Sequence, residues 1–141
     1  MEIDKEKTLN KINIIETSLS KLRQLSALSL NEFKNDFKNY DSAKYNLQIS
    51  IEAMIDIGNH IISRKSLGVP KTYADTFEIL CENGILPKDM LNIYKAMTKF
   101  RNKIVHFYDK VDDSEVYNII HNNLSDIEDF IKNIKGIIDA F

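Results

Sequence analysis

Apolar residues recur every three or four positions along almost the whole chain, which is the spacing of one face of an α-helix. Between residues 9 and 22 they form a single stripe that consists of Leu9, Ile12, Ile15, Leu19 and Leu22. Helix-breaking residues are scarce, with four glycines and two prolines in 141 residues. No run of β-branched residues alternates between turn residues, as a strand would require. The pattern predicts an all-α protein.

The second predicted helix begins at Ser29, which forms a capping-box pattern with Glu32. We expect this helix to kink near Tyr40 and to end at Gly68. Gly58 falls on its apolar face, where the missing side chain would let a neighbouring helix approach closely. The predicted apolar stripe consists of Phe33, Phe37, Tyr40, Leu47, Ile51, Met54 and Ile61.

Three further helices are predicted in the second half of the chain. A short one runs from Thr72 to Gly84, a long one from Pro87 toward Tyr108, and a last one from Asp112 to the C-terminus. Short loops between long helices favour antiparallel neighbours. We therefore predict an antiparallel bundle of four long helices plus one short helix.

The composition limits the classes of function. With 43% hydrophobic and 28% charged residues, residues 1–141 fit one globular domain. Because the net charge is −2, RNA binding would have to use a local basic patch. Cys81 is the single cysteine, which excludes an intramolecular disulfide and a cysteine-built zinc site, and we expect it in the core. Neither a signal-peptide pattern nor a membrane-length apolar run is seen, so a cytoplasmic protein without membrane contact is expected.

The fourth predicted helix has an unusual charge pattern. The segment 90–108 has no acidic residue and four basic ones, Lys95, Lys99, Arg101 and Lys103. The polar face of this helix contains Lys95, Lys99, Asn102 and His106. Such a face suits an RNA phosphate backbone. The alternative is a solvated face that pairs with acidic neighbours.

The position of Arg101 on this helix is also informative. The buried stripe is predicted to consist of Met90, Ile93, Met97, Phe100, Ile104 and Phe107. Arg101 lies at the edge of that stripe, where it either snorkels to the surface or faces a partly desolvated cleft. On a straight helix Arg101 and His106 point about 140° apart. Either the helix is distorted near Val105, or the two residues reach a wide cleft from its two sides, or a two-fold dimer supplies one from each chain.

Arg101, His106 and Tyr108 together form an R-x4-H-x-Y pattern, with Asn102 directly after the arginine. On the penultimate long helix of an all-helical chain of this size, the pattern resembles that of the HepT toxins, a branch of the HEPN superfamily. Upstream segments resemble the same family, namely residues 45–53, 59–62, 73–77 and 83–87.

The resemblance implies a metal-independent endoribonuclease toxin with no cofactor, whose active cleft forms where two motif helices meet in a homodimer. It also implies a nucleotidyltransferase antitoxin as partner, which transfers AMP to Tyr108. In this interpretation Arg101 binds phosphate, His106 acts as acid and base, and Asn102 orients the histidine or the phosphate. The residues expected to line the cleft are Glu52, Lys99 and Lys103.

These residue types suit cleavage of RNA by its own 2′-hydroxyl. An ordinary imidazole, with a pKa near 6.5, can remove or return a proton near neutrality, and an arginine fork can hold two phosphate oxygens. An alternative function is a non-catalytic nucleotide- or substrate-binding subunit beside a nucleotidyltransferase. Such a scaffold would not need Arg101, His106 and Tyr108 together.

Other polar and aromatic residues receive structural interpretations. Glu52, Asp56 and His60 fall at four-residue spacing, and a solvated or cleft-lining row is favoured over a metal site. His121 is expected at the surface. Five tyrosines are predicted to be packing residues: Tyr40, Tyr45, Tyr73, Tyr94 and Tyr117.

Overall fold

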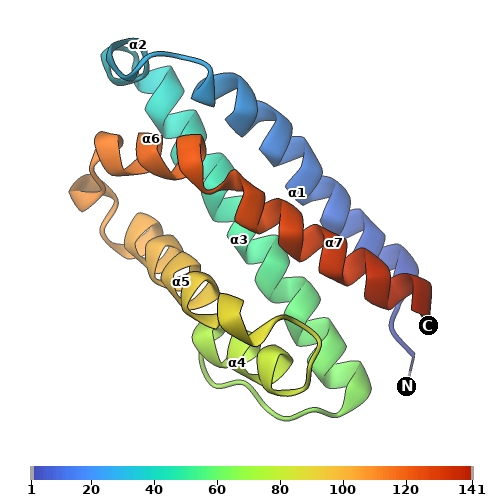
Figure 1. Cartoon of the computed structure of the whole chain (residues 1–141). Coiled ribbons are helices and arrows are strands. Elements are labelled where there is room, and N and C mark those ends of the chain that lie inside the picture. Colours follow the sequence, from blue (N-terminus) through green and yellow to red (C-terminus); the bar gives the residue numbers. More distant parts are fainter. Residues whose placement is uncertain (1, 141) are drawn as a thin grey trace.

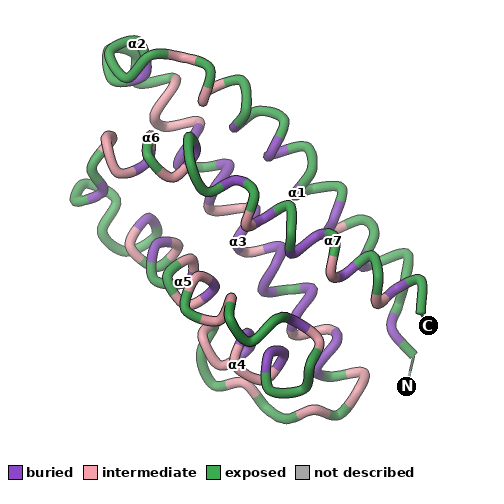
Figure 2. The backbone as a smooth tube through the Cα atoms, in the orientation of Figure 1, coloured by how far each residue is buried: buried purple, intermediate pink, exposed green. Residues whose placement is uncertain are grey.

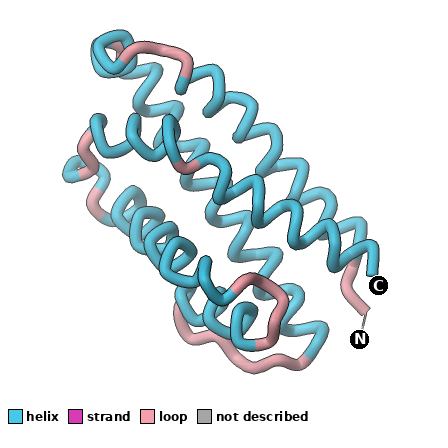
Figure 3. The backbone as a smooth tube through the Cα atoms, viewed as in Figure 1, coloured by secondary structure: helices cyan, strands magenta, loops and turns pink. Residues whose placement is uncertain are grey.

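The computed structural model describes residues 2–140, so residues 1 and 141 of the predicted domain lie outside the described part. Within that part every regular element is helical and none is a strand, and the prediction of an all-α fold is confirmed (Figure 3). The helices are α1 (Lys5–Ser26), α2 (Leu30–Asn35), α3 (Phe37–Lys65), α4 (Tyr73–Glu82), α5 (Leu91–His106), α6 (Asp113–Asn122) and α7 (Leu124–Ala140). Two short 3₁₀ turns are η1 (Lys88–Met90) and η2 (Tyr108–Lys110).

The four long helices α1, α3, α5 and α7 alternate in direction, as Figure 1 shows. The 29-residue helix α3 runs through the middle of the molecule and contacts α1, α4, α5 and α6. The short helix α4 packs near the end of α3 and against the start of α5. This central position lets α3 supply partners to residues from several other helices.

The capping box at the start of the second predicted helix is present. Glu32 N–H donates to Ser29 Oγ at 3.2 Å, and Ser29 N–H donates to the Glu32 carboxylate at 3.0 Å. The predicted kink near Tyr40 is wrong, because the chain breaks earlier, at Asp36, into α2 and α3. Asp36 has extended backbone angles and its carboxylate caps α3 by accepting from Lys38 N–H at 2.9 Å. A short acidic side chain that bonds its own neighbouring backbone competes with the helix.

The later helix boundaries also differ from the prediction. The last predicted helix is two helices, α6 and α7, separated at Asn123, a residue type with low helix propensity. Pro87 precedes the η1 turn rather than opening a helix, and α5 begins only at Leu91. Helix α5 ends at His106, so Tyr108 lies in the η2 turn beyond it.

The core follows α3, whose inward face is buried along most of its length (Figure 2). Gly58 lies where α4 crosses this helix, and a Cβ atom added there would be 2.7 Å from Thr76 Cγ2 and 3.0 Å from Leu80 Cδ1. The predicted close approach at this glycine is therefore confirmed. Cys81 is buried, as expected.

The aromatic residues divide between the core and the surface. Tyr94 is fully buried and its ring stacks on Phe77 at a centroid distance of 5.0 Å. The packing interpretation is thus confirmed for Tyr94, but it is wrong for Tyr45, which is 60% exposed. His121 is exposed, as expected. None of the described helices is long and apolar enough to cross a membrane.

Candidate active site

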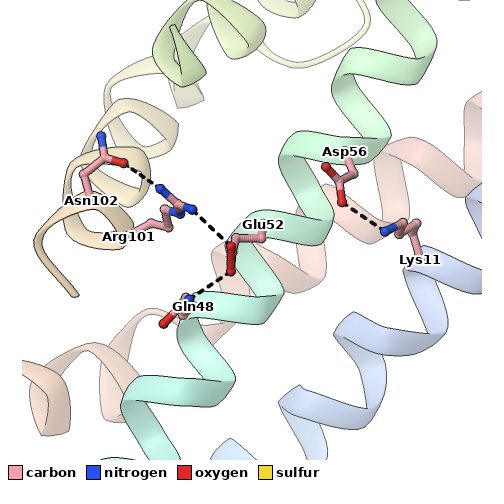
Figure 4. A network of polar contacts seen from close by, with 6 residues as sticks. All are labelled: Lys11, Gln48, Glu52, Asp56, Arg101 and Asn102. Atoms are coloured by element: carbon pink, nitrogen blue, oxygen red, sulfur yellow. Dashed lines mark hydrogen bonds and ion pairs between the residues drawn. The ribbon is translucent and has the colours of Figure 1, made fainter. Parts of the chain in front are cut away.

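The guanidinium of Arg101 points from α5 toward α3 (Figure 4). Its Nη2 donates to Glu52 Oε2 at 3.2 Å, and its Nη1 donates to Asn102 Oδ1 at 3.2 Å. Its carbon Cζ lies 4.9 Å from the ring centroid of Tyr73, the first residue of α4. Only 13% of the Arg101 side chain is exposed. Arg101 is therefore enclosed between three helices rather than snorkelling into solvent.

This arginine keeps unused hydrogen-bonding capacity. The contacts to Glu52 and Asn102 occupy two of the five N–H donors that a guanidinium has, and Arg101 Nε is buried without a partner among the described residues. Glu52 is itself held by Gln48, whose Nε2 donates to Glu52 Oε1 at 3.1 Å. A fixed and partly desolvated guanidinium with free donors is suited to a phosphate group.

The polar row on α3 makes three separate contacts. Glu52 pairs with Arg101, and Asp56 pairs with Lys11 Nζ at 3.0 Å (Figure 4). His60 Nε2 accepts a hydrogen bond from the backbone N–H of residue 4 at 2.9 Å. Burial lowers the pKa of His60, which favours the neutral ring that this bond requires. The row is thus a series of structural contacts with different parts of the chain.

His106 is the exposed last residue of α5. The helix is regular up to this point, since Phe107 N–H donates to Lys103 C=O at 2.8 Å, the bond expected in an undistorted α-helix. This regularity excludes the distortion near Val105 that was one of the three alternatives. Arg101 and His106 therefore point to different sides of the helix, about 140° apart. A single chain does not bring the two side chains together.

Apolar side chains flank His106 at the surface. Phe107 was expected in the buried stripe, but it is 58% exposed because the chain leaves the helix there, with φ −138° and ψ 45°. Val105 is also exposed. The end of α5 thus presents an apolar surface on both sides of the histidine.

Tyr108 lies in the η2 turn and contacts the first half of α3. Its hydroxyl donates to Asp41 Oδ1, and Lys44 Nζ lies 4.6 Å from its ring centroid. Lys44 is only 5% exposed and pairs with Asp113 Oδ1 at 3.1 Å. Burial, and then the hydrogen bond to Asp41, raise the pKa of Tyr108. At neutral pH the hydroxyl is therefore protonated, and its hydrogen bond to Asp41 holds it in place.

Sequence reasoning missed Asp41 and Lys44 as partners of Tyr108. The one available signal was Lys44 itself, because a lysine three positions before Leu47 falls near the apolar stripe of α3 and needs a buried partner there. Nothing in the local sequence links Asp41 to a tyrosine 67 residues away.

The basic residues of α5 have mostly found acidic partners on other helices. Lys95 pairs with Glu78 at 3.8 Å and Lys103 with Glu115 at 3.3 Å, in addition to Arg101 with Glu52. A solvated face that pairs with acidic neighbours is thus the right description for Lys95 and Lys103. Lys99 is exposed and has no ion pair within the described residues.

Comparison with known proteins agrees with this arrangement. Residues 15–134 match the family model of the HepT-like ribonucleases. The chain is 35% identical over 128 residues to the mRNA nuclease HepT of Shewanella oneidensis, covering 91% of this chain and 96% of that one. It is 25% identical over 128 residues to the tRNA nuclease HepT of Aphanizomenon flos-aquae, covering 91% of this chain and 87% of that one.

Solved structures show the same fold. One is a toxin–antitoxin crystallised with AMP-PNP, at a TM-score of 0.87 and 33% identity, covering 93% of this chain and 98% of that one. Another is the tri-AMPylated Shewanella oneidensis HEPN toxin in complex with the MNT antitoxin, at a TM-score of 0.86 and 33% identity, covering 96% and 99%. By the family match and the coverage of its relatives, the chain belongs to the HepT-like ribonuclease family.

Proposed function

We propose that this protein is the toxin of a toxin–antitoxin pair and that it cleaves RNA without a metal ion. The observation that carries the proposal is Arg101, which is largely enclosed, fixed by Glu52 and Asn102, and left with unused donors. A phosphate of the RNA backbone is the ligand that such a group fits best. The similarity to HepT mRNA and tRNA nucleases supports the same activity.

The proposed reaction uses the RNA's own 2′-hydroxyl as nucleophile. The 2′-oxygen forms a bond to phosphorus and the bond to the 5′-oxygen breaks, which leaves a 2′,3′-cyclic phosphate and a 5′-hydroxyl. Arg101 offsets the charge that builds up on the phosphate oxygens. His106 removes the 2′ proton or protonates the leaving oxygen, and Asn102 positions the phosphate through its contact with Arg101.

We propose that a homodimer completes the cleft. A regular α5 projects Arg101 and His106 toward different sides, so one helix alone does not present both to a single phosphate. A two-fold pairing of α5 with its copy would place the arginine of one chain near the histidine of the other. The exposed Val105 and Phe107 beside His106 support this, since contact with a second copy would bury them.

We propose that the partner is a nucleotidyltransferase antitoxin that transfers AMP to Tyr108. Similarity to an AMPylated HEPN toxin in complex with the MNT antitoxin supports this proposal. Tyr108 lies just beyond the motif helix, and it is exposed enough to meet a second protein. An attached AMP would add negative charge and bulk close to the cleft and compete with RNA phosphate. RNA and ATP are both cytoplasmic, and we propose that the protein acts there.

The test uses the purified chain and a single-stranded RNA in excess EDTA. We expect cleavage with 2′,3′-cyclic phosphate ends, and we expect His106→Ala and Arg101→Ala to abolish it while circular dichroism stays unchanged. Activity that disappears with chelator and returns with magnesium would contradict the metal-free mechanism. Expression without the antitoxin should arrest growth and degrade RNA, whereas a non-catalytic binding subunit would do neither.

A further inference from the structure

A polar pocket lies beside Arg101, and of its lining residues only Asn102 takes part in the chemistry proposed above. Its volume is about 380 Å³, within the range of pockets that hold small organic ligands. It lies between α3, the start of α4 and α5. The pocket is lined by Asn59, Pro70, Lys71, Thr72, Tyr73, Thr76 and Asn102. Because Asn102 bonds the Arg101 guanidinium, the pocket adjoins the group that would hold the scissile phosphate.

Tyr73 supplies an aromatic surface to this pocket. This residue is 39% exposed although its ring is held on one side by the Arg101 guanidinium. A tyrosine that is fixed and yet partly exposed can stack a flat ring at little further loss of conformational freedom. Proteins that bind unpaired RNA commonly stack bases on such rings.

The polar wall of the pocket presents hydrogen-bond donors. Asn59 Oδ1 accepts from Thr76 Oγ1 at 2.7 Å, and Asn102 Oδ1 accepts from Arg101 Nη1 at 3.2 Å. Both amide oxygens are therefore engaged, while neither amide nitrogen donates to any acceptor among the described residues. Lys71 adds a further donor. This wall fits a ligand edge that is rich in acceptors.

The start of α4 disfavours a phosphate in the same place. The Asp75 carboxylate accepts hydrogen bonds from Lys71 N–H at 3.0 Å and Thr72 N–H at 3.2 Å. These bonds lower the pKa of Asp75, so the group remains negatively charged at neutral pH. A carboxylate already satisfies the donors that an incoming phosphate would seek at this helix end. An uncharged ligand is favoured.

We propose that this pocket binds a nucleobase of the RNA beside the scissile phosphate. The base stacks on Tyr73, and Asn59 and Asn102 donate to its acceptors. Uracil O4 and guanine O6 are carbonyl acceptors at the ring positions where cytosine and adenine carry an amino donor. An amide nitrogen that donates to this position therefore favours uracil or guanine over cytosine or adenine. The proposal rests on the ribonuclease function above and adds a base preference to it.

The pocket is separated from the modification site along α3. Asp41, which contacts Tyr108, and Asn59 are 18 residues apart, or about 27 Å at 1.5 Å per residue. Substitutions at Asn59, and at Tyr73 on the same side of the pocket, should therefore leave AMP transfer to Tyr108 unaltered. This gives an independent check that a pocket variant is folded and competent.

The test measures, by fluorescence anisotropy, the binding of six-nucleotide RNAs. Their 2′-hydroxyls are methylated, so that they cannot be cleaved. The wild type should bind the uridine hexamer more tightly than the cytidine or adenosine hexamer. Tyr73→Ala should weaken binding by about ten-fold or more, the usual loss for one stacked base. Tyr73→Phe should keep it within about two-fold, since the ring remains. Tyr45→Ala, which removes an exposed tyrosine outside the pocket, should have no effect.

A second variant tests the hydrogen-bonding edge. Asn59→Asp keeps the oxygen that accepts from Thr76 but replaces the donating nitrogen with an acceptor, and it should abolish or reverse the preference of uridine over cytidine. If Asn59→Asp prefers uridine over cytidine as strongly as the wild type does, the proposed hydrogen bonds to the base are wrong. If Tyr73→Ala binds the RNA as tightly as the wild type, the proposed base-binding role of the pocket is wrong. It is also wrong if this substitution dissociates the dimer. Because these RNAs are never cleaved, a base preference in a protein without nuclease activity would refute the ribonuclease function and leave the pocket standing.

Discussion

The hydroxyl of Tyr108 donates a hydrogen bond to the carboxylate of Asp41, which joins the η2 turn to the first half of α3. The pKa of Tyr108 is raised by burial and by this bond, so the phenol stays protonated at neutral pH. For AMP transfer its oxygen must attack the α-phosphorus of ATP and lose that proton while pyrophosphate leaves. In the proposed transfer Asp41, which already accepts the hydrogen bond of this hydroxyl, is the acceptor for that proton.

Replacing Asp41 with asparagine should slow AMP transfer to Tyr108 by roughly 100-fold, the scale of losing a general base. The measurement is a time course of intact mass with the cognate nucleotidyltransferase and ATP. Asp56→Asn, on the same helix but paired with Lys11, is the matched control and should behave as the wild type. Faster modification in Asp41→Asn would mean that the carboxylate restrains the tyrosine instead of activating it.

We expect Glu52 to act mainly by holding the Arg101 guanidinium in position, and we expect the negative charge of Glu52 to be less important. Removing the side chain in Glu52→Ala releases the guanidinium, and kcat for RNA cleavage should fall by about ten-fold or more. Glu52→Gln retains an oxygen acceptor for Nη2 and should recover most of that loss. Steady-state kinetics on an RNA oligomer separates kcat from KM. Wild-type activity in Glu52→Ala would show that the contact does not position the arginine.

Tyr94→Phe should stabilise the protein. The Tyr94 hydroxyl is buried and has no hydrogen-bond partner among the described residues, while its ring packs on Phe77. Removing an unsatisfied hydroxyl should raise the free energy of unfolding by about 1 kcal/mol. Urea denaturation measures it. A loss of stability would mean that the hydroxyl has a partner, such as a water molecule.

The same variant should change the response to alkali. Burial raises the pKa of Tyr94 above its ordinary value of 10. The part of the free energy of unfolding that depends on this proton is therefore present below pH 10. It is lost as the pH rises further, because the unfolded chain releases the proton first. Between pH 10 and 11 the wild type should lose up to about 1.4 kcal/mol more than Tyr94→Phe. Parallel curves for the two proteins would contradict the assignment.

Two glycine substitutions should have opposite effects. Gly58→Ala should destabilise the protein by about 1–2 kcal/mol, because the added Cβ meets Thr76 at 2.7 Å and the hydroxyl of Thr76 is tethered to Asn59. Gly136→Ala adds a methyl group to an exposed helical position where the new Cβ would meet no side chain and no other part of the chain within 4 Å, and it should stabilise by up to about 1 kcal/mol. Chemical denaturation compares the pair. Equal effects at both positions would contradict the close packing of α4 on α3.

The dimer proposal predicts a mass in light scattering of about twice 16.3 kDa. Phe107→Asp should shift the protein toward the monomer, because a charge placed in an apolar contact must be desolvated. Nuclease activity should fall together with the dimer. A monomeric wild type with full activity would exclude a cleft shared between two chains.

The success of sequence reasoning depended on the distance over which each feature acts. The capping box of Ser29 and Glu32 is set within four residues and was predicted correctly. The break at Asp36 was missed, because the apolar spacing continues across it and the choice between helix and cap depends on one short side chain. The bond from Tyr108 to Asp41 joins residues 67 positions apart, and no local pattern contains it.

The same limit applies to charge. The basic segment of α5 contains no acidic residue of its own, and the sequence left open whether acidic neighbours pair with it. Glu78 and Glu115 reach Lys95 and Lys103 from other helices. Arg101 and His106 were named as candidate reactive residues from a motif, whereas their angular separation followed from helix geometry alone. Whether a second chain closes that separation is a property of two molecules and is not encoded in the spacing within one.

The single helix α3 fixes three partners in one rigid register, Asp41 for Tyr108, Glu52 for Arg101 and Asn59 for the pocket. A point mutation can alter any one of them without moving the others. Inserting or deleting one residue between Glu52 and Asn59 would instead rotate the part of α3 that contains Glu52 by about 100° relative to the part that contains Asn59. In the proposed function, a substitution around the pocket would therefore change base preference alone, whereas a one-residue insertion or deletion in α3 would disturb more than one of these contacts at once.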